Sequence, residues 1–201
     1  IAFLVATIGL FFIFRQLKSI FIPLAAISTT LIWVAGIMAY YGITINVVSY
    51  LTFNLLIIIG ASNAIHLLMK YHEGLSIGLS KSDSLARVIN KIGGALFLTS
   101  FTTAVGFCSL AFTNIKITQQ FGLIVAFGVI LMFILTIIIM PIILNFINPP
   151  NASHIRRLIK GEQFRGAHQL NAWNTNNPLP ILAVSLVLLI VTLFGLYRMD
   201  Y

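Results

Sequence analysis

Charged side chains are scarce in this chain: 8% of its 201 residues are Asp, Glu, Lys or Arg, whereas 59% are hydrophobic. Soluble domains carry about 25% charged residues, so the composition excludes a soluble globular protein. Acidic residues are the scarcest, with four against twelve Lys and Arg. The basic residues lie in short segments between apolar runs, where membrane orientation and lipid head groups account for them. We therefore expect membrane lipids as partners and no nucleic acid.

Cysteine is also nearly absent. The single Cys108 excludes an internal disulfide and a cysteine cluster for zinc or iron–sulfur, and its apolar surroundings indicate a small packing residue. We expect no cofactor and no metal. The chain opens at Ile1 rather than Met, within an apolar segment that ends at Phe14 and is too short to span a bilayer. This start, without a signal-peptide cleavage pattern, predicts an excised fragment.

Long apolar runs recur along the chain, and a membrane-spanning helix needs about 20 such residues. They predict an all-α, polytopic transmembrane helical bundle, with half a helix over residues 1–14 and spans over 20–41, 47–71, 92–113, 120–147 and 180–197. A polar loop is expected over 72–91, containing a short surface helix over 82–90 that Ser82 or Asp83 caps. Residues 114–119 predict a turn, and the basic segment 153–173 predicts an interfacial helix.

The Lys and Arg residues fall unevenly when these spans are threaded alternately through a membrane. Ten of the twelve lie on one side, and only Lys116 and Arg198 lie on the other. The positive-inside rule makes the ten-residue side cytoplasmic.

A compact polar group interrupts the span over 47–71. Ser62, Asn63 and His66 are expected to form one polar cluster, since residues three and four apart share a helix face, with Gly60 and Ala64 as a small-residue pair beside it. An unpartnered polar group in hydrocarbon costs about 2 to 7 kcal/mol, so this face must meet other helices or a wet cavity. Hydrogen bonding that only holds the bundle together and a role in transport or ligand binding are both open.

The span over 92–113 is rich in hydroxyls and small residues. Thr99, Thr103 and Gly106 lie on one stripe, and Thr102 with Gly106 makes a second small-residue pair. Hydroxyls can also donate to carbonyls of their own helix, which needs no partner helix. In the next span, Gly122 and Ala126 are further candidates for close helix packing.

Four motifs then occur in order: FRQLK over 14–18 leading to IPL over 22–24, IGASNAIHLL over 59–68, TSFTTAVGF over 99–107 and QFG over 120–122. Together they resemble the RND exporter superfamily, with its MMPL branch the closest likeness. The resemblance implies that the chain contains the family's second to seventh transmembrane helices, and that the first of these, at the start of the chain, is truncated. Residues 20–147 would lie in the part that the family shares with sterol-sensing-domain proteins. It implies a bundle over 1–147, a basic cytoplasmic linker over 148–178 and the first helix of a second half over 179–201. In the family, each half also carries a large extracytoplasmic domain after its first helix, and neither domain is present here.

One departure from the family is chemical. Proton-driven members show Asp-Tyr where this chain has Ser62-Asn63, and all four of its acids lie in loops or at the end of a span. The resemblance implies part of a secondary transporter that exports lipids or other hydrophobic molecules across the inner membrane. It would be driven by the proton-motive force if the missing half of the chain, its expected partner, keeps a carboxylate. The alternative is a sterol-sensing-like module that binds lipid without pumping, and a homo-oligomer is possible for either.

Residues that are candidates for a proton relay or substrate path are Ser62, Asn63, His66, Thr99 and Thr103. His66 is either a neutral imidazole bonded to a hydroxyl of the 99–103 stretch, as burial favours, or the group that carries the proton. A serine hydrolase is a third class, because Ser62 and His66 stand one helical turn apart. It lacks a recognisable group that orients the base and donors for an oxyanion, so no enzyme is expected.

Overall fold

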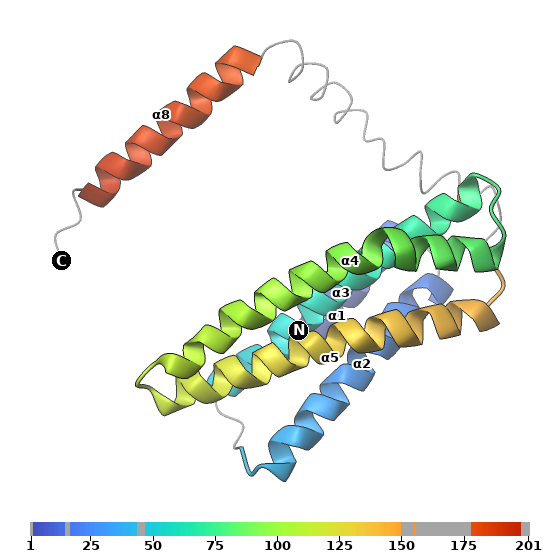
Figure 1. Cartoon of the computed structure of the whole chain (residues 1–201), viewed down its shortest axis with the longest axis horizontal. Helices are drawn as coiled ribbons and strands as arrows, with labels where there is room; N and C mark the ends of the chain where they lie inside the picture. Colours follow the sequence, from blue (N-terminus) through green and yellow to red (C-terminus); the bar gives the residue numbers. More distant parts are fainter. Residues whose placement is uncertain (1, 15–16, 44–46, 150–154, 156–177, 198–201) are drawn as a thin grey trace. The chain divides into compact units, whose positions relative to one another are not determined.

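A computed structural model of the chain describes residues 2–14, 17–43, 47–149, 155 and 178–197. Every regular element among these residues is helical; in chain order they are α1 Ala2–Phe14, α2 Leu17–Tyr40, α3 Val47–Ser76, α4 Lys81–Cys108, the 3₁₀ turn η1 Ser109–Phe112, α5 Lys116–Phe146 and α8 Pro178–Tyr197 (Figure 1). Four stretches are long and apolar enough to cross a membrane: Ser19–Tyr40, Ser49–Ser76, Lys81–Phe112 and Lys116–Phe146. The prediction of an all-α, multi-pass membrane protein is confirmed.

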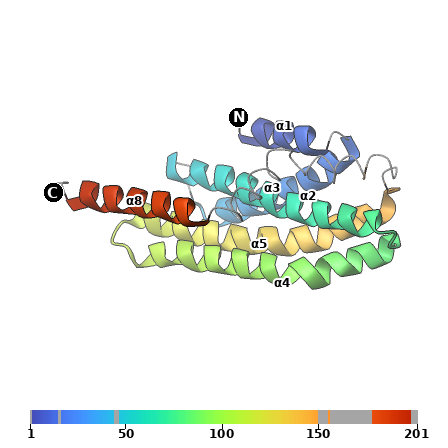
Figure 2. The same cartoon turned by 90° about the horizontal axis from the view of Figure 1, so that it is seen from above.

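Helices α1 to α5 belong to one compact unit, Ile1–Leu158, and α8 belongs to a second, Ile159–Tyr201. In the first unit, α5 packs against α2, α3 and α4, while α1 lies against α2 and α3 (Figure 2). The sequence of α5 suits this central position because it carries no charged residue after Lys116 and buries side chains such as Val125, Val129 and Met132.

Glycines bring the central helices close together. A Cβ added at Gly60 of α3 would lie 2.7 Å from Met132 Cε of α5, and one added at Gly128 would lie 2.8 Å from Leu56 Cδ1 of α3. Since real Cβ atoms essentially never come within 3.0 Å of another atom, a larger residue at either position would force the facing Met132 or Leu56 side chain, or the helices themselves, to move. Small residues here permit the close approach that stabilises membrane helix pairs in the absence of a hydrophobic driving force.

The connection between α3 and α4 is shorter than the sequence predicts. α3 continues to Ser76, and α4 begins at Lys81 and runs without a break into the apolar span, so the expected long loop and separate surface helix over 82–90 were wrong. The first turn is capped by Ser80, whose Oγ accepts a hydrogen bond from the backbone N–H of Asp83 at 3.1 Å. Because residues 81–92 contain neither Gly nor Pro, the polar segment extends the membrane helix.

The turn before α5 is also shorter than expected. α4 ends at Cys108, η1 follows, and α5 already begins at Lys116 rather than after residue 119. Gln119 then lies in the first turn of α5, and its side-chain Nε2 donates to the Thr113 carbonyl at 2.6 Å. Polar residues at a membrane surface can extend a helix as readily as they end it, so the end of an apolar run does not mark the end of the helix.

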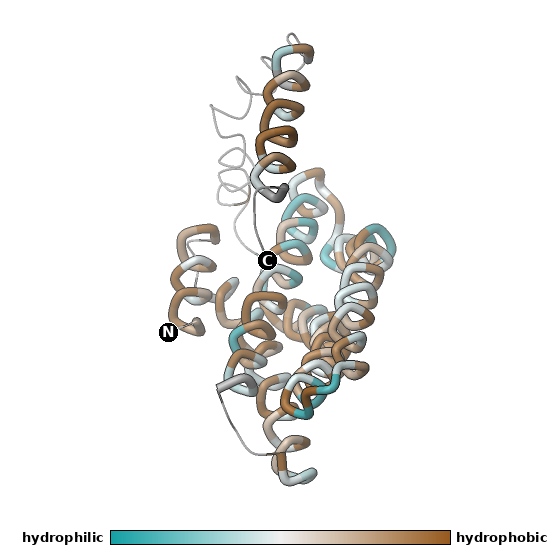
Figure 3. Tube along the Cα trace, turned by 90° about the vertical axis from the view of Figure 1, so that its left-hand side faces the viewer, coloured by the Kyte–Doolittle hydropathy of each residue, from teal (hydrophilic) through white to brown (hydrophobic). Residues whose placement is uncertain are grey.

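α8 is apolar along most of its length (Figure 3). Its crossing of the membrane stays a prediction, as do the boundaries of the three predicted domains. The expected interfacial helix over 153–173 lies outside the described residues, except for Ile155.

Candidate functional site

An exposed polar stripe runs along α3. Its members are spaced by four residues, which places each beside the next on a helix surface: Tyr50, Asn54, Ile58, Ser62, His66 and Lys70. All are exposed except Asn54, which is half-buried. Ile58 is its only aliphatic member, so the polar stripe of α3 extends over most of the helix and ends in a cation.

Ser62 and His66 lie together on this stripe, and the structure separates them from Asn63. Neighbouring residues on a helix point about 100° apart, and Asn63 faces the packed side with Gly60 and Ala64, where it is 5% exposed. Its side-chain Nδ2 has no hydrogen-bond partner in the described part of the chain. The expectation of one three-residue cluster therefore gives way to an outward pair and one inward amide.

No hydrogen bond joins Ser62 to His66 within the described ranges, and the hydroxyls of α4 are occupied elsewhere. Thr99 donates to the Ala95 carbonyl at 2.9 Å, and Thr103 donates to the Thr99 carbonyl at 2.7 Å. These bonds satisfy the hydroxyls within their own helix. The expected bond from His66 to this stretch is accordingly not observed among the described residues, and the imidazole is exposed.

An open groove of about 670 Å³ lies between α1 and α3, and the N-terminal members of the polar stripe line one side of it. Apolar residues such as Val5, Ala6 and Ile58 form most of its lining, and its polar groups come from Tyr50, Asn54 and Ser62. Mostly apolar walls with a few placed polar groups are typical of sites that bind small hydrophobic molecules.

Tyr50 and Asn54 were missed in the sequence reasoning. Asn54 is the one amide side chain in the apolar run before the central polar group, and it stands eight residues before Ser62. Counting in steps of four from Ser62 toward the N-terminus would have found both residues.

The small residues proposed for packing fall into two groups. Gly60, Ala64, Gly122 and Ala126 are buried in the bundle, and a Cβ added at Gly122 would lie 2.4 Å from the Phe107 carbonyl oxygen. Thr102 and Gly106 are exposed on α4, and nothing among the described atoms lies within 4 Å of a Cβ added at Gly106. A packing role for this second pair stays a prediction.

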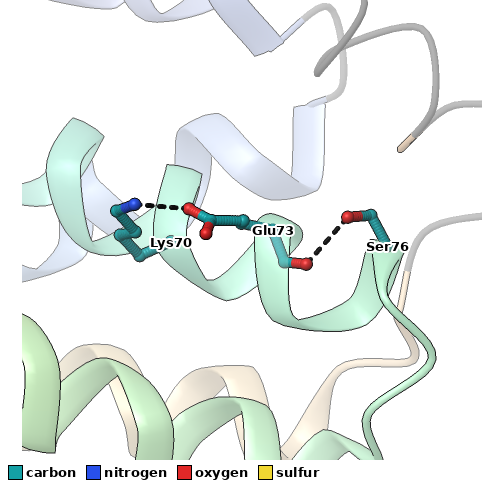
Figure 4. Close-up of polar contacts among 3 residues, drawn as sticks. All are labelled: Lys70, Glu73 and Ser76. Atoms are coloured by element: carbon teal, nitrogen blue, oxygen red, sulfur yellow. Dashed lines mark hydrogen bonds and ion pairs between the residues drawn. The ribbon is translucent and has the colours of Figure 1, made fainter.

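Acidic groups lie only at helix ends in the described part of the chain. Glu73 forms an ion pair with Lys70 in the last turns of α3 (Figure 4), and Asp83 lies in the first turn of α4. Among the described residues, therefore, no carboxylate stands beside Ser62 or His66.

Comparison with known proteins adds the family. Residues 1–181 match the model of the MMPL family. The chain is 24% identical to the membrane protein YdfJ of Bacillus subtilis and 25% identical to the membrane protein MJ1562 of Methanocaldococcus jannaschii, over 66% and 73% of its length. It is also 24% identical, over 68% of its length, to the probable transport protein MmpL12 of Mycobacterium tuberculosis. These alignments span 18%, 37% and 12% of the three relatives.

Proposed function

Because this chain belongs to the MMPL family of the RND superfamily of membrane transporters, we propose that it forms part of a secondary transporter that exports lipids or other hydrophobic molecules across the inner membrane. The observation that carries the proposal is the exposed polar stripe of α3. Polar side chains within a membrane span are costly against lipid and mark substrate or ion pathways. The central members of the stripe, Ser62 and His66, share one face and accordingly line one side of a water-filled path, and a second bundle of the same kind lines the other side.

The groove between α1 and α3 supports a hydrophobic substrate. Its apolar lining suits an acyl chain or a similar tail, and Tyr50, Asn54 and Ser62 supply the hydrogen-bonding groups for a polar part of the same molecule. A side chain that fills the groove should therefore slow transport without unfolding the bundle.

The proposed role of His66 is to carry the coupling proton, or to donate to a carboxylate of the second bundle. It is the one basic side chain on the stripe before Lys70, and histidine commonly serves as a proton shuttle in proteins. Ser62 and Asn63, at the positions of the family's Asp-Tyr pair, carry no group suited to that role. The other candidates for the proton or substrate path keep a supporting role in this proposal. They are Asn63, whose amide faces the inside of the bundle, and Thr99 and Thr103 on the neighbouring helix α4.

Substitution of His66 tests the coupling. In the protein produced from its own gene, His66→Gln should fold and lose proton-driven transport, because Gln hydrogen-bonds but does not titrate. Ser62→Ala should retain most transport. Thr102→Ala is the matched control, since Thr102 is exposed on α4 and donates to the Leu98 carbonyl of its own helix at 2.9 Å. Wild-type transport by the Gln variant from about pH 5.5 to about pH 8 would refute the role given to His66.

A lipid-sensing module without pumping is the second candidate function, and the same groove favours it. Ile58→Trp should fill the groove, and Ile32→Trp, on an exposed position of α2, is its matched control. If Ile58→Trp abolishes lipid binding while the wild-type protein in vesicles binds lipid but never moves it across the bilayer, the sensing function replaces the transporter.

A further inference from the structure

Three cations surround one carboxylate where α3 ends and α4 begins. Glu73 pairs with Lys70 on its own helix (Figure 4), and it lies within electrostatic reach of Arg87 and Lys91 on α4. Asp83, four residues before Arg87 on α4, is a second carboxylate at this end of the described helices, so the three cations exceed the two carboxylates by one positive charge. The side chains of Lys70 and Glu73 are 49% and 42% exposed, Lys91 is exposed, and Arg87 is half-buried, so the basic patch, defined as Lys70, Arg87 and Lys91, is accessible mainly at its two lysines.

A close helix contact assembles the basic patch. A Cβ added at Gly74 would lie 2.9 Å from Ser84 Oγ, so α3 and α4 come close at this point. Arg87 and Lys91 follow Ser84 by three and seven residues, which places them on the face of α4 that meets α3. The glycine next to Glu73 thus brings the cations of one helix to the carboxylate of the other.

The basic patch lies at the depth of the lipid head groups. Lys70 is the first charged residue after the apolar run of α3, and Lys91 is the last one before the apolar run of α4. A charged side chain at the edge of a hydrophobic span extends its head to the interface while its methylene stem stays in contact with apolar groups. The nearby Lys81 is engaged elsewhere, since its Nζ donates to the Asn145 carbonyl at the end of α5 at 2.6 Å.

We propose that the basic patch binds the phosphate of an anionic phospholipid, in the leaflet that the charge distribution identifies as cytoplasmic. Ammonium and guanidinium groups donate charge-assisted hydrogen bonds to phosphate oxygens, and basic pockets between membrane helices on the cytoplasmic side are suited to lipid head groups. Glu73 opposes the same phosphate, so it limits the affinity. The bound lipid stabilises the contact between α3 and α4 from the membrane side.

Native mass spectrometry of the protein in a neutral detergent, titrated with phosphatidylglycerol and separately with phosphatidylcholine, tests this proposal. The wild-type protein should bind phosphatidylglycerol more tightly. Arg87→Gln and Lys91→Gln should each weaken that binding about fivefold, which corresponds to the loss of about 1 kcal/mol per basic residue. Glu73→Gln should strengthen it, a gain that misfolding cannot produce. Lys116→Gln, which removes one exposed lysine at the far end of α4 and α5, should leave it unchanged.

Four results would overturn the proposal. The first is equal affinity for the two lipids, and the second is equal losses of affinity in Lys91→Gln and Lys116→Gln. The third is competition by soluble glycerol 3-phosphate as strong as by the lipid, which would indicate a site for free phosphate. The fourth is an altered oligomeric state in Arg87→Gln and Lys91→Gln at unchanged lipid affinity, which would indicate a protein interface.

Discussion

Gly122→Ala should be among the most damaging single-methyl additions to the bundle. The added Cβ would lie 2.4 Å from the carbonyl oxygen of Phe107 and 2.7 Å from Leu110 Cβ, at the contact between α5 and the end of α4. A carbonyl oxygen is part of the backbone and cannot rotate away as a side chain can. The two helices must therefore move apart by about 0.6 Å to reach the 3.0 Å that real Cβ contacts respect.

The expected cost follows from the kind of atom that blocks the methyl. Overpacking costs about 1 to 3 kcal/mol and sometimes more, and the immobile carbonyl places Gly122→Ala at about 3 kcal/mol. Gly60→Ala should cost about 1 to 2 kcal/mol, because its closest obstacle is the flexible end of Met132 at 2.7 Å. Gly36→Ala is the control: nothing lies within 4 Å of its added Cβ, and alanine gains up to about 1 kcal/mol over glycine in a helix.

The free energy of unfolding can be measured by titrating the protein in mixed micelles with a denaturing detergent and following tryptophan fluorescence. Stability should fall in the order Gly36→Ala, Gly60→Ala, Gly122→Ala. If Gly122→Ala is as stable as Gly36→Ala, the contact between α4 and α5 is looser than the structure has it and the reasoning fails.

Two further predictions concern α4. Cysteines introduced at Ser82 and Asn114, exposed near opposite ends of α4, should react with an impermeant maleimide from opposite sides of the membrane in a Cys108→Ala background; labelling from one side would contradict the topology. Ser80→Ala should lower the free energy of unfolding by about 1 kcal/mol, because the Asp83 N–H loses its 3.1 Å acceptor; an unchanged value in the same micelles would exclude a capping role.

The helices were predictable because an uncharged apolar run in a bilayer has few alternatives to a helix. The residues at which the helices begin and end were less predictable. The polar segment from Lys81 to Lys91 reads equally well as a loop or as an extension of the helix, and the Ser80 cap and the Gly74 contact with Ser84 decide for the helix. Such contacts depend on two helices meeting, which no single segment encodes.

The candidate site was predictable in part. The spacing of Ser62 and His66 places them on one face without any tertiary information. Which face is packed depends on where Met132 of α5 meets Gly60, and that contact turns Asn63 inward. The groove requires α1 and α3 together, so Tyr50 and Asn54 acquire their role only from the assembled bundle.

Transport itself tests the central claim most directly. The protein produced from its own gene would be reconstituted in vesicles with a fluorescent phospholipid analogue, and an imposed proton gradient would supply the driving force. We expect net movement of the lipid that requires the gradient, stops when a proton ionophore collapses it, and is lost in His66→Gln while Thr102→Ala behaves as wild type. Lipid binding without net movement, or movement indifferent to the gradient, would contradict the account.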